Sequence, residues 1–230
     1  MKQGEQSDKK LASFSESAIW TAFPSMIKHL QATRIKPANV TERMQTFESQ
    51  RGLNATIILV SATCIEGFIV DCLKSFLLGD QFASKDTFEG RLDHDFLERV
   101  QRATFDDFPD LFRLAIGKPL SELIADKDLI KGVQALIRFR NGIAHGRSFV
   151  YLTYEDTEEG DAELDKQYKA VHAYLEEKHL VWGRDEILNN KVADHFASLI
   201  KPYMEAVLAQ LPIPQSDNVK ASVRYAFKYC

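Results

Sequence analysis

The chain has 230 residues, of which 45% are hydrophobic and 27% are charged, and its formal net charge is −4. This length and composition are typical of a soluble globular protein with a sizeable core. The negative balance excludes a globally basic nucleic-acid coat, so any nucleic acid has to be bound by a local patch. Three cysteines without a Cys-x-x-Cys spacing argue against a disulfide framework or a thiolate zinc site and favour a reducing compartment.

The N-terminal part of the chain predicts helices after a short polar lead. Residues 1–10, MKQGEQSDKK, indicate a flexible N-terminus with no apolar signal segment. Apolar residues then recur at helical spacing from Leu11 to Leu30, and Pro24 is expected to bend or divide this helix. Pro37 and Thr41 mark the start of another helix.

A strongly apolar helix is predicted from Asn54 to Leu78, with Gly79 as its stop. Its buried face is expected to comprise Ile58, Ser61, Ile65, Phe68, Ile69, Cys72 and Phe76. The stretch has about the length of a membrane span, but it contains Glu66, and a charge near the bilayer centre costs roughly 2.5–3.5 kcal/mol. We therefore expect a buried core helix, no membrane contact and a cytoplasmic location.

Helical patterns continue through the middle of the chain. Two shorter helices are expected over residues 93–103 and 105–116, the second closed by Gly117. The next helix is expected to begin near Asp126 or Asp128 and to end before Gly146. Its apolar stripe consists of Leu129, Val133, Leu136 and Ile137, and the stripe continues into Arg140 and Ala144.

The segments that follow are mixed. SFVYLTY, residues 148–154, predicts a short strand that could pair with HLVWG, residues 179–183. Seven of the eleven residues from Glu155 to Asp165 are acidic, which is typical of a solvated loop or an exposed helix start, with a regulatory RNA-mimicking flap as the alternative. Helices are expected over residues 162–178 and 185–211, the latter bent by Pro202.

These elements predict a mainly α fold: a bundle of four to five core helices, with a small β-strand pair inserted before the last long helix. We expect a flexible N-terminus over residues 1–10 and a single helical domain over residues 11–211. An insert occupies residues 150–184 of that domain, and a C-terminal tail or short helix follows over residues 212–230.

One stretch, RFRNGIAHGR at residues 138–147, carries chemistry. Asn141 and His145 are four residues apart, so they share one face of a helix. Histidine suits proton transfer because its pKa lies near neutrality, and the arginine fork of Arg140 matches two phosphate oxygens. Together they suit RNA cleavage, in which a ribose 2′-OH attacks the adjacent phosphate without a metal. A solvated, basic helix end is the simpler alternative.

A possible partner for this stretch lies on an earlier helix. Glu66 is the only charged residue between Arg51 and Asp71, and a lone acid in apolar surroundings is rarely buried unless it is paired. We expect Glu66 to meet Arg140 or Arg138 across two packed helices. Such a pair would fix the helix register, orient an arginine for phosphate, or do both.

RNGIAH resembles the R-x4-H motif of the HEPN family, whose members with this motif are largely metal-independent endoribonucleases that work as dimers. The resemblance implies catalytic roles for Arg140 and His145, a supporting role for Asn141 and a positioning role for Glu66. It also implies a toxin–antitoxin or anti-phage setting, with an antitoxin as a possible protein partner. In toxins of this family that are paired with a minimal nucleotidyltransferase, a tyrosine usually stands two residues after the histidine. This chain has Arg147 at that position.

Further basic residues are candidates for contact with RNA. Arg138 and Arg147 flank the motif, and the tail places Lys220, Arg224 and Lys228 at four-residue spacing on one helix face. A solvated helix face is the alternative for the tail. The remaining histidines show no metal-ligand spacing, and we expect neither a metal nor a cofactor. A catalytically idle helical interaction module is the alternative to the ribonuclease.

Overall fold

The structure is a computed structural model, and it describes residues 19–34, 40–76, 87–144, 159–182, 187–211 and 215–228. Within these ranges 82% of the residues are helical and none forms a strand. An ordinary globular domain has about one third of its residues in helices, so the predicted mainly α class is confirmed. The bundle of four to five core helices stays a prediction.

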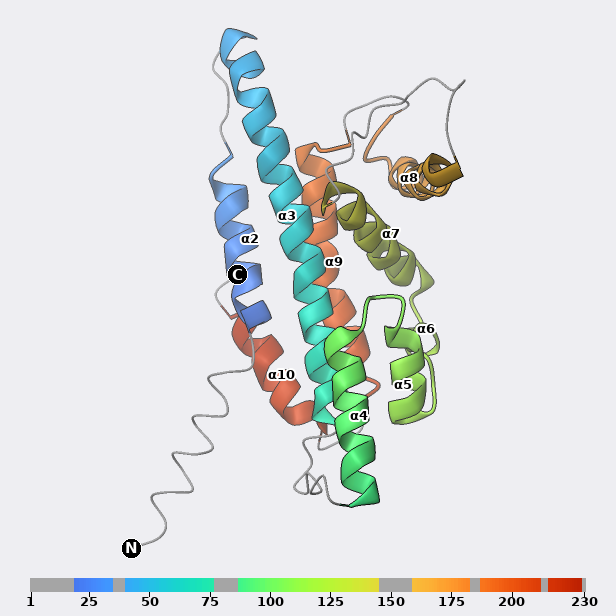
Figure 1. The fold of residues 1–230 in the computed structure, drawn as a ribbon. Helices are drawn as coiled ribbons and strands as arrows, with labels where there is room; N and C mark the ends of the chain where they lie inside the picture. Colours follow the sequence, from blue (N-terminus) through green and yellow to red (C-terminus); the bar gives the residue numbers. More distant parts are fainter. Residues whose placement is uncertain are drawn as a thin grey trace, which may run out of the picture. The chain divides into compact units, whose positions relative to one another are not determined.

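The described elements are all helices (Figure 1). In chain order they are η1 (Ile19–Ala22, a 3-10 helix), α2 (Phe23–Ala32), α3 (Val40–Ser75), α4 (Phe88–Arg102), α5 (Phe108–Ile116), α6 (Leu120–Leu123), α7 (Lys127–Ala144), α8 (Glu159–Glu177), α9 (Asn190–Leu208) and α10 (Gln215–Ala226).

The chain forms two compact units. The first contains Met1–Ser25, Cys64–Leu123 and Ala206–Cys230, and the second contains Met26–Thr63 and Ile124–Glu205. The boundary falls inside α2, α3 and α9, so these helices contribute residues to both units. The single domain over residues 11–211 stays a prediction.

In the first unit, η1 is fixed to the second half of α3 through Trp20. The indole Nε1 donates a hydrogen bond to Asp71 Oδ2 at 2.6 Å, and the ring packs edge-on against Phe68 at 5.7 Å between centroids. A Cβ on Gly67 would lie 2.9 Å from Trp20 Cβ, so the close approach requires glycine. Burial raises the pKa of Asp71, and the Trp20 hydrogen bond opposes that shift.

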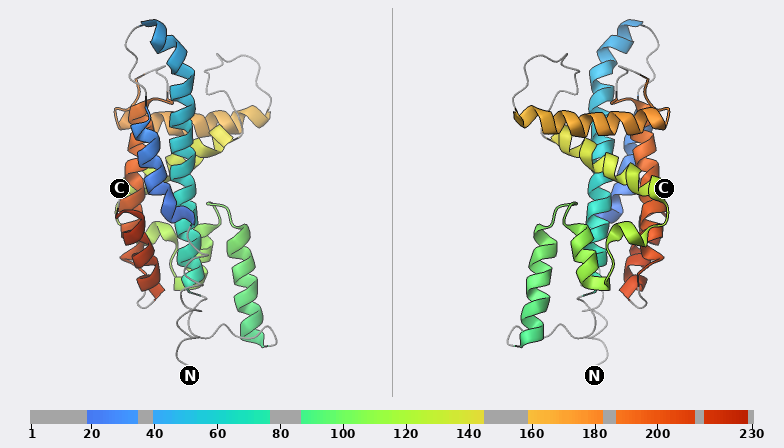
Figure 2. Two further views of the ribbon diagram at one scale, coloured as in Figure 1. Left: turned by 90° about the vertical axis from the view of Figure 1, so that its left-hand side faces the viewer. Right: turned by 90° about the vertical axis from the view of Figure 1, so that its right-hand side faces the viewer.

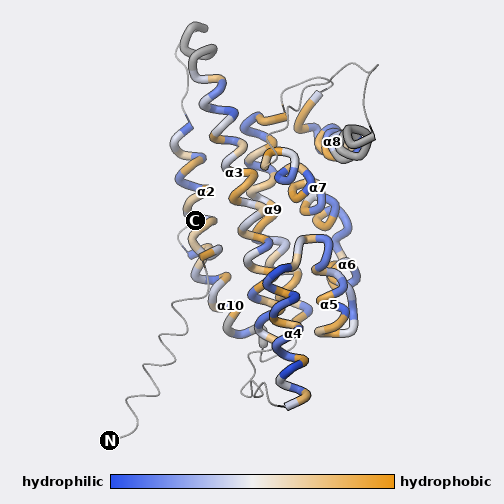
Figure 3. Tube along the Cα trace, in the orientation of Figure 1, coloured by the Kyte–Doolittle hydropathy of each residue, from blue (hydrophilic) through white to orange (hydrophobic). Residues whose placement is uncertain are grey.

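Helix ends in the first unit follow local capping rules. The hydroxyl of Thr87 accepts the Gly90 N–H at 3.0 Å, and this cap starts α4 at Phe88, five residues before its predicted start. Gly117 ends α5 in the left-handed conformation (φ 78°), with its N–H bonded to Arg113 O, as the sequence predicted. Figure 3 shows α4 as a largely hydrophilic helix.

In the second unit, α7, α8 and α9 pack closely. Figure 2 shows α8 beside α7, with the two helices inclined to one another, and they are in contact. Gly132 of α7 makes this possible, because a Cβ there would lie 2.6 Å from Tyr174 Oη and 2.7 Å from Leu199 Cδ1. The buried Phe139 and Phe196 rings lie 5.9 Å apart between centroids and join α7 to α9.

A buried polar network also holds the second unit together. Asn54 of α3 is 2% exposed, and its amide donates to Leu188 O at 2.8 Å and to Asn190 Oδ1 at 3.0 Å. Its carbonyl oxygen accepts from Arg34 Nη2 at 3.0 Å. Arg34 Nη1 lies 2.7 Å from both carboxylate oxygens of Asp194, so the end of α2 is tied to α3 and α9.

Several predicted boundaries were wrong. Two helices were predicted, the second beginning at Asn54, but residues 40–75 form one continuous helix. Gly52 lies inside it at an exposed position, and Asn54 lies inside it with its buried amide hydrogen-bonded. The last long helix begins at Asn190, since the Asn189 side chain caps Val192 N at 2.9 Å. The segment HLVWG was predicted as a strand, but its described residues 179–182 form a turn and irregular backbone. The proposed partner strand, residues 148–154, lies outside the described residues.

Other expectations were confirmed. Pro24 stands in the first turn of α2, directly after η1, where its missing N–H leaves no helical bond unmade. Asp126 Oδ1 accepts the Leu129 N–H at 3.0 Å and caps α7 at the predicted position. A helix is present in the tail, where α10 buries Val219 and Val223.

Helix α3 is long and apolar enough over Thr46–Ser75 to cross a membrane by length and composition. Its most apolar window is 56% buried within the structure. Core helices of soluble proteins have the same properties. The expected absence of a membrane and the cytoplasmic location stay predictions.

Candidate functional site

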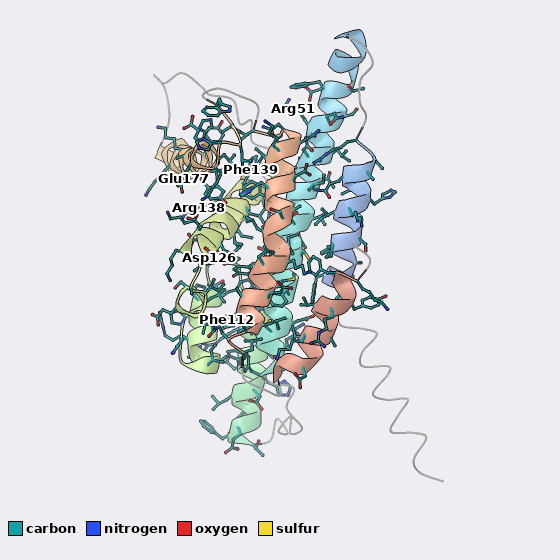
Figure 4. All side chains as sticks on the ribbon, turned by 180° about the vertical axis from the view of Figure 1, so that it is seen from behind. Arg51, Phe112, Asp126, Arg138, Phe139 and Glu177 are labelled. Carbon is teal, nitrogen blue, oxygen red and sulfur yellow. The ribbon has the colours of Figure 1, made fainter. Side chains whose placement is uncertain are left out.

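The Arg–Asn part of the motif lies on the last turns of α7. The predicted apolar stripe of this helix, Leu129 to Ile137, is buried, and Phe139 extends it with no exposure at all. Figure 4 shows the side chains of Arg138 and Phe139 on this helix. Arg138 is exposed, whereas Arg140 and Asn141 are half-buried, so Arg140 points partly toward protein as predicted.

The two half-buried residues are bonded to each other. Arg140 Nη1 donates a hydrogen bond of 2.9 Å to Asn141 Oδ1. Neighbouring residues on a helix do not share a face, so this contact depends on the length of the arginine side chain. The bond fixes one edge of the guanidinium. His145, Gly146 and Arg147 lie outside the described residues.

Glu66 is half-buried on α3, within the first compact unit. Arg138 and Arg140 belong to the second unit. The pairing of Glu66 with either arginine therefore stays a prediction.

The basic residues of the tail lie on α10 and directly after it. Lys220 is half-buried, with its ammonium 3.8 Å from Asp217, while Arg224 and Lys228 are exposed. Tyr225 beside them is also exposed.

The acidic segment, residues 155–165, lies only partly within the described structure. Residues 159–165 form the first turns of α8, and residues 155–158 lie outside the described part.

Sequence reasoning missed an aromatic groove in the second unit. The groove has a volume of about 440 Å³ and is lined by Phe47, Gln50, Arg51, Asn54, Leu180, Trp182, Leu188, Asn189, Asn190 and Lys191. Its walls come from segments more than a hundred residues apart, so no spacing in the sequence joins them. Trp182 is the one signal of this groove in the sequence, but its segment HLVWG was predicted to be a strand.

A polar cluster of α7, α8 and α9 was also missed. The Tyr174 hydroxyl lies 2.7 Å from His195 Nε2, and Lys178 Nζ lies 2.8 Å from Asp128 Oδ2. Burial lowers the pKa of His195, and the charge of Lys178 adds to that shift. Burial raises the pKa of Tyr174. Both rings are therefore neutral at pH 7, and the cluster acts as a packed junction.

Among the described residues, no group of three His, Cys, Asp or Glu side chains lies close enough together to hold a metal ion. Cys64 and Cys72 are buried free thiols, and burial together with Asp71 raises the pKa of Cys72 well above its ordinary value.

No protein-family model, curated protein or solved structure matches the chain.

Proposed function

We propose that the chain is a metal-independent endoribonuclease of the HEPN type, in which Arg140 and His145 are catalytic and Asn141 supports Arg140. The observation that supports this most is the 2.9 Å bond from Arg140 Nη1 to Asn141 Oδ1 on the last described turn of α7. It holds a half-buried guanidinium at the start of the motif, five residues before His145 in the sequence.

The chemistry assigns a separate task to each group. The ribose 2′-OH attacks the adjacent phosphorus while the bond to the 5′-oxygen breaks, which gives a 2′,3′-cyclic phosphate and a free 5′-OH. His145 gives a proton to the leaving 5′-oxygen, and a position near a helix C-terminus favours its charged form. Arg140 stabilises the extra negative charge on the phosphorane oxygens.

The reaction needs a base as well as an acid, and each chain supplies one motif histidine. A two-fold dimer places a second copy of the motif opposite the first. We therefore propose a homodimer with the ends of its α7 helices at or beside the two-fold axis. A toxin–antitoxin or anti-phage setting, with a protein antitoxin as partner, is part of the same proposal.

The test is cleavage of labelled single-stranded RNA in excess EDTA by the wild type, His145→Ala and Arg140→Ala. His145→Ala is expected to lose about 10²–10⁴ in rate, and Arg140→Ala about 10²–10³. DNA of the same sequence should stay intact because it lacks the 2′-OH. Lys131→Ala, an exposed lysine on the same helix, serves as the matched control and should cleave like the wild type.

Two results would count against the proposal. Cleavage that EDTA abolishes would exclude the metal-free mechanism. Equal cleavage by wild type and His145→Ala would identify a contaminating nuclease and favour the idle interaction module. Light scattering at tens of micromolar provides a separate test, because a monomer would leave the site with one histidine.

A further inference from the structure

The aromatic groove between the N-terminal part of α3 and the start of α9 has features of a binding site for single-stranded nucleic acid. All of its described lining residues belong to the second compact unit. They supply two exposed aromatic rings, two cations and a set of side-chain amides, and no carboxylate is among them. Stacking rings beside cations suit a polymer of planar bases and phosphates.

Trp182 provides the first ring. Its side chain is 66% exposed, which is unusual for the largest apolar side chain. The His179 ring stacks on it, with 5.5 Å between centroids and 21° between planes. A stacked ring uses one face for its neighbour, so the exposed indole can receive a base on its remaining surface.

The backbone around His179 is arranged to hold this stack. Leu180 N donates to Leu175 O at 2.9 Å and His179 N donates to Glu176 O at 2.9 Å, the pattern of a Schellman turn at the end of α8. The residue at the left-handed position of this turn is usually glycine, but here it is His179 with φ 56°. A non-glycine residue in this conformation is uncommon and persists where surrounding contacts hold it. The His179 side chain is held by its stack on Trp182.

Phe47 and Arg51 form the opposite wall. The Arg51 guanidinium lies over the Phe47 ring, 5.7 Å from its centroid, and its Nη1 is 3.2 Å from both oxygens of Glu48. Phe47 is 46% exposed and the Glu48 side chain 75% exposed. An ion pair this exposed is worth little in water, so Arg51 can exchange Glu48 for a phosphate at small cost.

The floor between the walls is held by hydrogen bonds. The buried Asn54 bonds to Leu188 O and Asn190 Oδ1, and Asn189 caps α9. Lys191 is exposed in the first turn of α9, which contains no acidic residue to offset its charge. A pre-formed floor lowers the entropy cost of binding.

The charge of the groove favours nucleic acid over other occupants. The first unit has a cavity of similar volume, about 450 Å³, but it is lined by Asp95, Glu98, Asp107 and Asp110 as well as by arginines. Those carboxylates repel phosphate, whereas the described lining residues of the groove in the second unit include Arg51 and Lys191 and no acidic side chain. The charge distribution therefore distinguishes the two cavities.

We infer that this groove binds single-stranded RNA, with a base stacked on Trp182 and the backbone phosphates beside Arg51 and Lys191. The choice of RNA over other single strands rests on the proposed ribonuclease function. The groove thus supplies a substrate-binding surface on the same compact unit as Arg140.

The test uses the full chain in the His145→Ala background, so that RNA is bound without being cut. The probes are single-stranded oligo(U) and oligo(A) of about ten nucleotides, followed by fluorescence anisotropy. The chain has two tryptophans, and Trp20 is 3% exposed, so RNA that stacks on Trp182 should quench the exposed component of the emission. Duplex RNA should quench little, because its bases are already stacked.

Removing Trp182 should weaken binding and abolish the quench. Trp182→Ala is expected to raise Kd about 5- to 150-fold, which corresponds to the ~1–3 kcal/mol of a stacked base. Trp182→Phe keeps a ring and should lose less. His179→Gly keeps the turn while removing the stacked imidazole, so a smaller loss is expected. Arg51→Ala and Lys191→Ala should each reduce the salt slope of binding by about 0.7.

Phe88→Ala and Lys201→Ala are the matched controls. They remove an exposed ring in the first unit and an exposed lysine farther along α9, and both should bind like the parent. Binding by Trp182→Ala within twofold of the parent, or an equal quench by duplex RNA, overturns the inference. So does capture of a peptide by the groove with no quench by RNA.

The inference and the proposed nuclease can fail separately. RNA binding and quenching without EDTA-resistant cleavage leave the groove in place and remove the enzyme. Cleavage that depends on His145, with Trp182→Ala binding normally, does the reverse.

Discussion

The Tyr174 hydroxyl and His195 Nε2 lie 2.7 Å apart, at a junction where α8 packs against α9 and the glycine of α7 leaves room for the phenol. Burial, followed by the charge of Lys178, lowers the pKa of His195. The folded state therefore resists a proton that the unfolded chain accepts at an ordinary pKa near 6.5. The burial of His195 therefore makes the stability of this junction sensitive to pH.

The free energy of unfolding should fall as the pH drops below about 6.5, because the unfolded state then binds more protons at His195 than the folded state. The contribution of His195 to the free energy of unfolding is complete above pH 6.5 and is lost as the pH falls toward the lowered pKa of the folded state. His195→Gln, which can still bond to Tyr174, should flatten the profile in this window. Urea unfolding at several pH values measures the difference, and the inference fails if both profiles run parallel.

Asn54→Ala should destabilise the second unit. The change leaves Leu188 O, Asn190 and Arg34 without one of their partners in a buried setting. An unsatisfied buried polar group costs about 1–3 kcal/mol, so the urea midpoint should fall with little change in slope. Thr56→Ala, which removes only a local bond to Gly52 O, should stay within about 0.5 kcal/mol. Equal effects would show that the network contributes nothing beyond a local bond.

Local signals in the sequence predicted α7 well and predicted the groove not at all. Asp126 as a cap and a regular stripe of buried aliphatic residues define that helix through nearby residues alone. The groove brings residues 47–54 together with residues 180–191, and only tertiary packing does this. HLVWG has the composition of a strand, but the left-handed His179 ends α8 there instead. Composition could not reveal a non-glycine residue in that conformation.

The candidate site was partly predictable for the same reason. The apolar stripe of α7 continues into Arg140, and the half-buried arginine agrees with that placement. The bond between Arg140 and Asn141 was not predicted, because adjacent helical residues point to different faces and only the length of arginine lets them meet. Phe139 is fully buried between two arginines, although it lies outside the predicted apolar stripe.

Gly132→Ala should lower the stability of the second unit. The new Cβ would meet Tyr174 Oη at 2.6 Å and Leu199 Cδ1 at 2.7 Å, so α8 or α9 would have to move. Overpacking of this kind costs about 1–3 kcal/mol, which lowers Tm by about 2–12 °C for a chain of this size. Gly52→Ala is the matched control, because nothing lies within 4 Å of that position. It should stabilise α3 by about 0.5–1 kcal/mol, and a loss at Gly52 as large as at Gly132 would contradict the packing argument.

Asn141 is expected to act as a positioning residue for Arg140. Asn141→Ala removes the acceptor at 2.9 Å and loosens that edge of the guanidinium, so cleavage should fall by about 10²-fold, the effect of misplacing a catalytic group by about an ångström. Asn141→Asp keeps an acceptor and the tether, but its negative charge competes with phosphate for the arginine. Asn141→Ala should therefore lower kcat, whereas Asn141→Asp should mainly raise KM for RNA. Thermal unfolding should change little in either variant, since Asn141 is only half-buried. A common loss of stability that accounts for both activities would make Asn141 a structural residue instead.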